Sequence, residues 1–362
     1  MAETPSHLER LIAEADAAPA APAIRKKRKG LRNTLIVLGS LVVLLAIAAG
    51  VAYAVLANSF NDINRVSIAQ DPTLTRPEAV TVKPGAKAPI NILLLGSDSR
   101  DTSDPTASVE EATGFRSDAI LVAQVSPDRK NLTVMSIMRD NWVPIQDHGE
   151  AKINAAVALG GMPLAVNTVE NFIGARIDHV ALVDFSSFTK LTDALGGVTV
   201  NNTQPFTSTH GGHAFAPGKI TLTGEEALGF VRERYAFADG DYQRARNQQA
   251  YLKGLMQGLL SKDTMTDPGK LTSTFQALKP YLVLDNDLDL QNAVSLGFDL
   301  RSIRSSDIQF FTSPTLGTGT SADGQSIVVP DPSALADVTA AFQGGTLNEY
   351  AATRAPGSEL PQ

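Results

Sequence analysis

The chain of 362 residues contains no cysteine, which excludes a disulfide framework, zinc held by thiolates and a cysteine nucleophile. The absence of cysteine does not indicate a compartment, because such a chain is compatible with reducing and oxidising conditions alike. A phosphate-binding G-x-x-x-x-G-K-S/T segment is also missing, and so is the G-x-S-x-G turn of serine hydrolases. These absences exclude the common nucleotide-dependent and serine-dependent chemistries.

A nucleic-acid partner is disfavoured by the distribution of charge. The net charge is -7, but residues 1–33 hold seven Lys/Arg against four Asp/Glu and are locally +3, so the remainder carries -10. An acidic body repels a polyanion. The most concentrated basic segment, residues 25–29, stands shortly before a long apolar run instead.

This apolar run, residues 34–57, predicts one membrane-spanning helix. Its 24 residues carry no charge, and a helix of this length reaches about 36 Å, more than the roughly 30 Å of a hydrocarbon core. A cleaved signal peptide is the alternative, but its apolar region is usually only about 7 to 15 residues long. The basic residues before the run predict a cytoplasmic N-terminus and a single-pass protein whose main body lies outside the cytoplasmic membrane.

The rest of the chain divides by composition. Residues 1–33 are expected to form a basic cytoplasmic tail, and residues 58–88, with three prolines, an extracytoplasmic stalk. Residues 89–343 are expected to form one folded domain, and residues 344–362 a flexible C-terminal tail.

The folded domain is predicted to be an α/β domain in which helices cover a mixed central sheet. Continuous apolar runs at 90–95, 119–125 and 132–137 predict buried strands, the last two joined as a hairpin. Helical periodicity alternates with short strands further along. The helices are expected at 163–173, 185–195, 224–234, 241–261 and 332–343, and the short strands at 179–183, 198–200 and 308–311.

Acidic and basic residues recur at the ends of the first three strands. Asp98 follows the first strand, Arg116 and Asp118 precede the second, and Arg139 and Asp140 follow the third. A single Asp after a strand is usually a turn residue, but repeated Asp and Arg at neighbouring strand ends point to a ligand site. Guanidinium groups bind phosphate oxygens in pairs, and carboxylates bind Mg²⁺ that bridges such oxygens. The pattern therefore favours a phosphate or pyrophosphate site.

Two further segments add to this site. Thr223 and Glu226 have capping-box spacing at the start of a helix that ends near Arg232 and Arg234. The next helix opens near 241 and places Arg244 and Gln248, four residues apart, on one face.

Taken in order, these segments resemble the LytR-CpsA-Psr family. The resemblance covers about residues 89–343, and the single helix before the domain matches as well. It is carried by NILLLGSDSR (91–100), RSD (116–118), SIMRD (136–140), KINA (152–155), GEEAL (224–228), RER (232–234) and Asp241 with Arg244 and Gln248. It implies a three-layer α-β-α domain outside the membrane. It also implies a phosphotransferase that moves an anionic glycopolymer from a polyprenyl pyrophosphate carrier to a peptidoglycan hydroxyl.

The resemblance also implies roles for individual residues. Asp98 and Asp118 would hold Mg²⁺, and Asp98, Arg116 and Arg139 would be catalytic, with Asp98 our choice of general base. The pyrophosphate oxygens would be bound by Arg116, Arg139, Lys152, Arg232, Arg234, Arg244 and Gln248. The chain departs from the family where many members have a second Arg after Arg244, because Asn247 stands there and Arg246 lies one position early.

The sequence leaves several alternatives open. A hydrolase would use the same groups with water as acceptor, and a non-catalytic module that binds lipid-linked polymer would not need both Asp98 and Asp118. The polymer is not identified among teichoic, teichuronic, capsular and arabinogalactan-like classes, and the acceptor is either peptidoglycan or a surface protein. The alanine-rich, lysine-poor composition is typical of actinobacteria.

Overall fold

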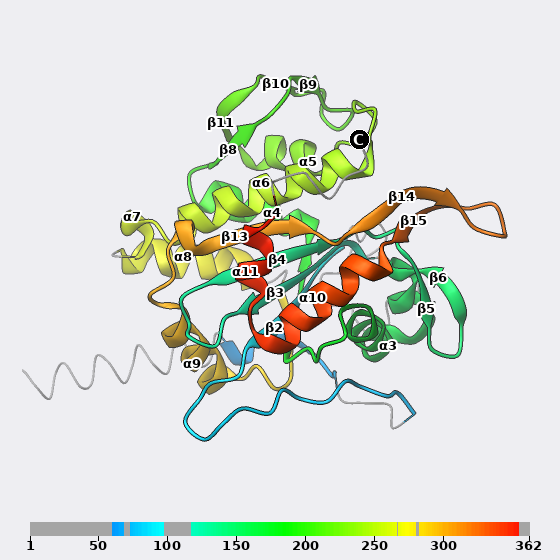
Figure 1. The fold of residues 1–362 in the computed structure, drawn as a ribbon. Coiled ribbons are helices and arrows are strands. Elements are labelled where there is room, and N and C mark those ends of the chain that lie inside the picture. Colours follow the sequence, from blue (N-terminus) through cyan, green and yellow to red (C-terminus); the bar gives the residue numbers. More distant parts are fainter. Residues whose placement is uncertain (1–59, 69–72, 98–116, 266, 280–281, 355–362) are drawn as a thin grey trace, which may run out of the picture. The chain divides into compact units, whose positions relative to one another are not determined.

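A seven-stranded mixed sheet forms the centre of the folded unit (Figure 1). Neighbouring strands β2, β3 and β4 are antiparallel, while β7 runs parallel to β2 and β13 parallel to β4. The predicted strands and the predicted hairpin are confirmed. In spatial order the strands are β1 (Asn64–Val66), β12 (Leu282–Asp285), β7 (His179–Asp184), β2 (Ile90–Ser97), β3 (Ser117–Val125), β4 (Leu132–Ile137) and β13 (Ile308–Thr312).

The computed structural model describes residues 60–68, 73–97, 117–265, 267–279 and 282–354. They belong to one compact unit that spans 58–362. Within the described ranges no helix is both long and apolar enough to cross a bilayer, and the predicted span 34–57 lies outside them.

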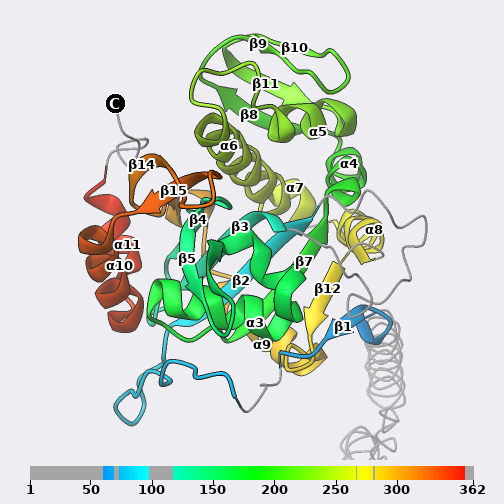
Figure 2. The same cartoon turned by 90° about the vertical axis from the view of Figure 1, so that its right-hand side faces the viewer.

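Helices cover both faces of the sheet, which explains why its strands are apolar without alternation. Leu93 and Leu95 face a core shared with α3 (Ala156–Ile173) and α10 (Pro332–Gly344). Ile92 and Leu94 point the other way, into a core with α6 (Asp241–Leu259) and α9 (Leu290–Leu300). Figures 1 and 2 both show α6 and α3 on opposite sides of the sheet, so the expected three layers are present.

A second, smaller core lies beyond α6 and positions the end of α5 (Gly224–Arg232). It contains Phe206, Phe230 and Tyr251. The predicted strand at 198–200 exists as β8 (Val198–Asn202), but it pairs with β11 (Gly218–Leu222) and not with the central sheet. The predicted capping box is confirmed, because the Thr223 N–H and hydroxyl each donate to Glu226 at 2.8 Å.

The remaining elements are short. They are β5 (Trp142–Ile145), β6 (Gly149–Lys152), α4 (Phe185–Ala194), β9 (Phe206–Thr207), β10 (Ala214–Phe215), α7 (Lys262–Met265), α8 (Pro268–Leu278), β14 (Thr315–Thr320), β15 (Ser326–Pro330) and α11 (Leu347–Ala352), with 3-10 turns at Ile153–Ala155 and Ser305–Asp307.

The segment expected to be a stalk, 58–88, contributes to the folded body. Strand β1 pairs in parallel with β12, and Phe60, Ile63 and Val66 are buried. A strand of three residues is too short to give a readable pattern, and the prolines beyond it favoured an extended linker. At the other end of the body, α11 buries Leu347, so the folded chain continues past 343 as well.

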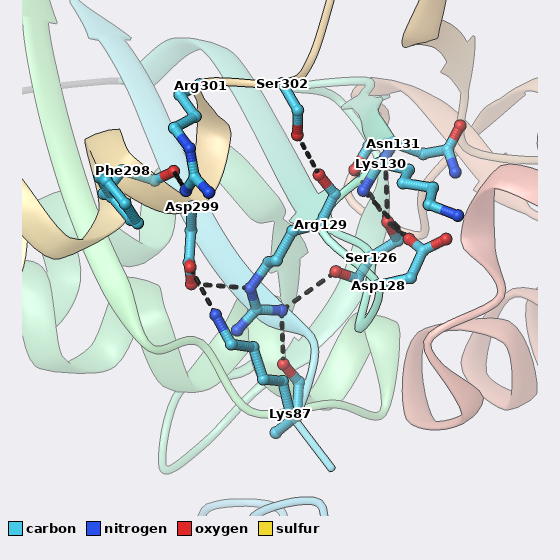
Figure 3. Close-up of polar contacts among 11 residues, drawn as sticks. Lys87, Ser126, Asp128, Arg129, Lys130, Asn131, Phe298, Asp299, Arg301 and Ser302 are labelled. Atoms are coloured by element: carbon cyan, nitrogen blue, oxygen red, sulfur yellow. Dashed lines mark hydrogen bonds and ion pairs between the residues drawn. The ribbon is translucent and has the colours of Figure 1, made fainter. Parts of the chain in front are cut away.

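Hydrogen bonds join the turn between β3 and β4 to two distant segments (Figure 3). This turn lies at the edge of the sheet opposite the end of β2 and the end of β4. Arg129 has a φ of 59° and donates from Nη1 to the carbonyls of Ala88 and Ser126. Its Nε donates to Asp299 at 2.8 Å. Hydrogen bonds from Lys87 and Arg129 hold the pKa of the Asp299 carboxyl below its usual value. Helix α9 is thereby fixed to the end of the sheet.

A buried ion pair gives a direct test that the segment before residue 89 is structural. Glu170 on α3 is fully buried, and Arg76 Nε donates to both its oxygens at 2.9 and 2.8 Å. Arg76→Met is expected to lower the free energy of unfolding by about 3–5 kcal/mol, because it leaves a buried, unpaired carboxylate. Denaturant unfolding of the full chain measures this.

The double variant Arg76→Met/Glu170→Leu is expected to recover most of the loss, because it removes the unpaired charge as well. The control is Lys83→Met, at an exposed position in the same segment, which is expected to change stability by no more than about 0.5 kcal/mol. Equal stability of Arg76→Met and Lys83→Met would show that the segment is not part of the cooperative unit.

Candidate functional site

Three strands bring their polar ends to one edge of the sheet. In the antiparallel register Ser97 pairs with Ser117, and Ile120 pairs with Ile137. The end of β2, the start of β3 and the end of β4 are therefore adjacent, as predicted. Asp118 is the second residue of β3, and Arg139 follows β4 by two residues. Asp98, Arg116 and the side chain of Asp118 lie outside the part of the chain that the structure describes.

The turn after β4 is fixed by backbone hydrogen bonds on two sides. The Asn154 N–H donates to the Arg139 carbonyl at 3.2 Å, and the Val328 N–H donates to the Asp140 carbonyl at 2.9 Å. One bond comes from the 3-10 turn after β6 and the other from β15. The turn therefore presents the side chains of Arg139 and Asp140 from a rigid backbone.

Asp241, the first residue of α6, lies at the centre of three arginines. Its carboxylate is 3.1 Å from Arg244 Nη2, 3.4 Å from Arg139 Nε and 3.6 Å from Arg234 Nη1. Burial acts to raise the pKa of Asp241, but the charges of Arg244 and Arg139 outweigh burial and hold the pKa below its usual range. Asp241 thus lies between guanidiniums from the turn after β4, the turn after α5 and the first turn of α6.

Glu233 fixes the turn that carries Arg234. It is fully buried, and its carboxylate accepts from the Thr209 hydroxyl at 2.9 Å and the Ala236 N–H at 2.9 Å. Burial acts to raise the pKa of Glu233, but these hydrogen bonds outweigh it and lower the pKa. Arg232 is the half-buried last residue of α5. The residue pattern alone assigns no role to Glu233 or Asp241, although Glu233 lies between two arginines and Asp241 three residues before Arg244.

Arg244 and Gln248 lie on one face of α6, as predicted. Both line a small cavity together with Arg139 and Asp241, and its floor is formed by apolar residues of β3 and β4. Arg246 points elsewhere and pairs with Asp239. At the position where the family pattern has a second Arg, Asn247 is buried and donates to the Phe230 carbonyl at 3.1 Å.

Lys152, also predicted to bind the pyrophosphate, does not line the cavity beside α6 but a second one beside β6. Its ammonium lies 3.1 Å from Asp140. It lines a cavity of about 320 Å³ that also contacts Arg139 and Gln325. Arg139 therefore stands between two spaces, one beside α6 and one beside β6.

Four cations of the described residues, Arg139, Lys152, Arg234 and Arg244, pair with Asp140 or Asp241. Guanidinium and ammonium groups gathered in this way suit a phosphate or pyrophosphate. Among the residues that the structure describes, no group of three or more acidic or histidine side chains is placed to hold a metal.

Most of the chain matches one known protein family. The LytR_cpsA_psr family matches residues 54–343. The chain belongs to the LytR_cpsA_psr family. It is 32% identical over 304 residues to the polyisoprenyl-teichoic acid–peptidoglycan teichoic acid transferase TagU of Enterococcus faecalis, covering 82% of this chain and 92% of that protein. The TagU of Bacillus subtilis is 30% identical, with 87% and 95% covered.

Solved structures of the family share the fold. Bacillus subtilis TagV superposes with a TM-score of 0.60 at 25% identity, over 72% of this chain and 98% of TagV. TagT bound to LI-WTA gives 0.58 at 27% identity, over 78% and 99%. These relatives come from Enterococcus and Bacillus, and the actinobacterial source stays a prediction.

Asp241→Asn tests whether the carboxylate holds the arginines together. The variant keeps the shape but leaves three guanidiniums without their shared counter-charge, so the free energy of unfolding at about pH 7 is expected to fall by about 1–3 kcal/mol. A depressed pKa stabilises the fold fully above the unfolded pKa of about 3.9, and this stabilisation is lost as the pH falls through the folded value. The difference between wild type and variant is therefore expected to shrink on acidification to about pH 3.

Denaturant titrations at the two pH values measure this difference. Asp337→Asn, at an exposed position on α10, is the matched control and is expected to stay within about 0.5 kcal/mol of wild type. A stability difference for Asp241→Asn that does not change with pH would contradict the assigned role.

Proposed function

We propose that the protein is a membrane-anchored phosphotransferase that moves an anionic glycopolymer from a polyprenyl pyrophosphate carrier to a peptidoglycan hydroxyl. The observation that carries the proposal is the convergence of Arg139, Arg234 and Arg244 at the strand edge. Family membership and the named activity of the TagU relatives support the reaction class. The apolar run at 34–57 supports the anchor, with the enzyme on the outer face of the membrane.

The arginines supply what phosphoryl transfer needs most. The phosphorus bears oxygens that gain or redistribute negative charge during the displacement, and preorganised cations stabilise that charge. Before substrate binds, Asp241 reduces the mutual repulsion of the three guanidiniums. A pyrophosphate then provides further oxygens to the same cations. No nucleotide is required, because the carrier's pyrophosphate bond already stores the energy of transfer.

The proposed place of the prenyl chain is the apolar space beside α6. The cavity that holds Arg244 and Gln248 has Ile120 and Ile137 on its floor. It adjoins the core between the sheet and α6, where Leu252 and Met256 are only partly buried. An apolar wall next to a cluster of cations matches the two ends of a lipid pyrophosphate.

Magnesium is part of the proposal. Asp98 and Asp118 are the proposed ligands, and a donor set of two carboxylates fits a cation that completes its shell with phosphate oxygens and water. When bound, Mg²⁺ would neutralise charge on the pyrophosphate. Asp98 stays our proposed general base for the acceptor hydroxyl.

Arg139→Ala is expected to lower kcat/KM for transfer by about 10²–10³-fold, because it removes a preorganised cation from the reacting phosphate. The assay uses the full-length protein in detergent with a polyprenyl-pyrophosphate-linked glycopolymer, Mg²⁺ and peptidoglycan, and follows the phosphodiester adduct by mass. Arg246→Ala is the matched control. Because Arg246 pairs with Asp239 and is not among the lining residues of either cavity, the control is expected to keep its rate within about threefold.

Two results would contradict the proposal. Equal rates for the Arg139 and Arg246 variants would show that the arginine cluster is not the reaction site. Polyprenyl phosphate and sugar phosphate without an adduct would indicate a hydrolase with water as acceptor, and an unchanged donor would indicate a binding module.

Chelation tests the metal separately. Treatment with EDTA is expected to abolish transfer, and added Mg²⁺ to restore it, because the pyrophosphate would lose the cation that neutralises part of its charge. In titration calorimetry, wild type is expected to bind inorganic pyrophosphate more tightly with Mg²⁺ than with EDTA. This difference in affinity is expected to be smaller in Asp118→Asn. Full transfer in the presence of EDTA would exclude a required metal.

A further inference from the structure

A cavity of about 320 Å³ lies beside β6. We define it as the hairpin cleft, lined by Arg139, Asp140, Lys152, Asn154 and Gln325. Its walls come from the β5–β6 hairpin with its following turn and from the tip of the β14–β15 hairpin. Apart from Arg139, it shares no lining residue with the cavity beside α6.

We infer that the hairpin cleft binds the sugar that carries the acceptor hydroxyl, a neutral stretch of glycan rather than a second phosphate. This inference rests on the proposed transfer, in which the oxygen that attacks phosphorus and the oxygen that leaves it are roughly in line on opposite sides. In the proposed function the lipid end of the donor lies on the side of α6. The acceptor therefore has to reach the phosphorus from another space that also contacts Arg139, and the hairpin cleft is such a space.

The chemistry of the cleft suits hydroxyl groups. Asp140 lies 3.1 Å from Lys152 and 3.5 Å from Arg139, so the charged groups of the cleft already pair with one another in part. Asn154 and Gln325 add amides, each of which has a donor and an acceptor. Sugar hydroxyls also donate and accept, so a polyol satisfies such a lining better than an anion does.

Trp142 extends this surface with an aromatic side chain. It lies directly opposite Lys152 in the antiparallel pair β5–β6, so the two side chains are on the same face of the hairpin. The indole is half-buried, and its N–H donates to Glu150 at 3.2 Å, which fixes the orientation of the ring. A sugar ring that leaves the cleft along β5–β6 would pack its apolar face on this indole.

Gln325 is held in place before any ligand arrives. Its N–H donates to the Ser321 hydroxyl at 3.0 Å, and its side-chain amide donates to Asp323 at 2.7 Å. The hairpin that carries it is bonded to the Asp140 carbonyl through the Val328 N–H. Both walls of the cleft are thus joined through the turn that presents Arg139, so a sugar bound between them is positioned relative to the reacting phosphate.

Binding of glycan to the full-length protein in nanodiscs tests the inference without requiring turnover. The probe is a soluble, uncrosslinked peptidoglycan glycan prepared with a muramidase, titrated calorimetrically in the absence of donor. Gln325→Ala, at an exposed turn position that the fold tolerates, is expected to weaken glycan binding about fivefold, and Trp142→Ala about tenfold. Gln291→Ala and Lys219→Met, at exposed positions on α9 and β11, are the controls and are expected to bind as wild type does.

A kinetic readout separates acceptor from donor. Gln325→Ala is expected to raise the KM for the glycan about fivefold and to leave the KM for the lipid-linked donor unchanged. Arg244→Ala is expected to do the reverse. A raised donor KM in Gln325→Ala, or glycan affinity equal to that of the controls, would overturn the inference.

Failure of the proposed function gives a different pattern. If wild type forms no adduct but binds glycan in a way that depends on Gln325 and Trp142, the transfer reaction is wrong while the glycan site stands. If wild type forms the adduct and both cleft variants behave as the controls do, the transfer stands and the glycan site is wrong.

Discussion

The electrostatic balance around Asp241 is the interaction on which the site depends. Three guanidiniums from three separate elements would repel one another at the edge of the sheet without a shared anion. The carboxylate lies at the first residue of α6, so the same helix that supplies Arg244 also supplies its counter-charge. The arrangement keeps the cations gathered in the absence of substrate.

The backbone around the site explains why those side chains are rigid. The turn after β4 receives hydrogen bonds from Asn154 and Val328, and the turn after α5 is fixed by the buried Glu233. Each arginine therefore starts from a backbone that packing and hydrogen bonds have already ordered, which is the condition for electrostatic preorganisation. The β5–β6 and β14–β15 hairpins, which support Arg139, also form the walls of the hairpin cleft. The elements that hold Arg139 in place therefore also shape the proposed acceptor site.

Much of the sheet was predictable because its strands are long, apolar and buried on both faces. The runs at 90–95, 119–125 and 132–137 differ from β2, β3 and β4 only at their ends. Strands β1 and β12 escaped prediction because three or four residues carry no periodicity, and they join the sheet only through long-range pairing. The buried ion pair of Arg76 could not be predicted either, because its partner Glu170 is 94 residues away in the sequence.

The sequence by itself determined the chemistry that is available: Asp and Arg at successive strand ends, Arg244 and Gln248 on one helical face, and an apolar run long enough to cross a bilayer. These features are local, and period, spacing and residue type suffice to read them. The tertiary structure decided which charges meet. It placed Asp241 among three arginines, and it brought Lys152 and one of those arginines, Arg139, into a cleft with Gln325, 173 residues after Lys152 in the chain. Such contacts depend on strand order and on the packing of α6 against the sheet, and no local pattern in the sequence encodes either.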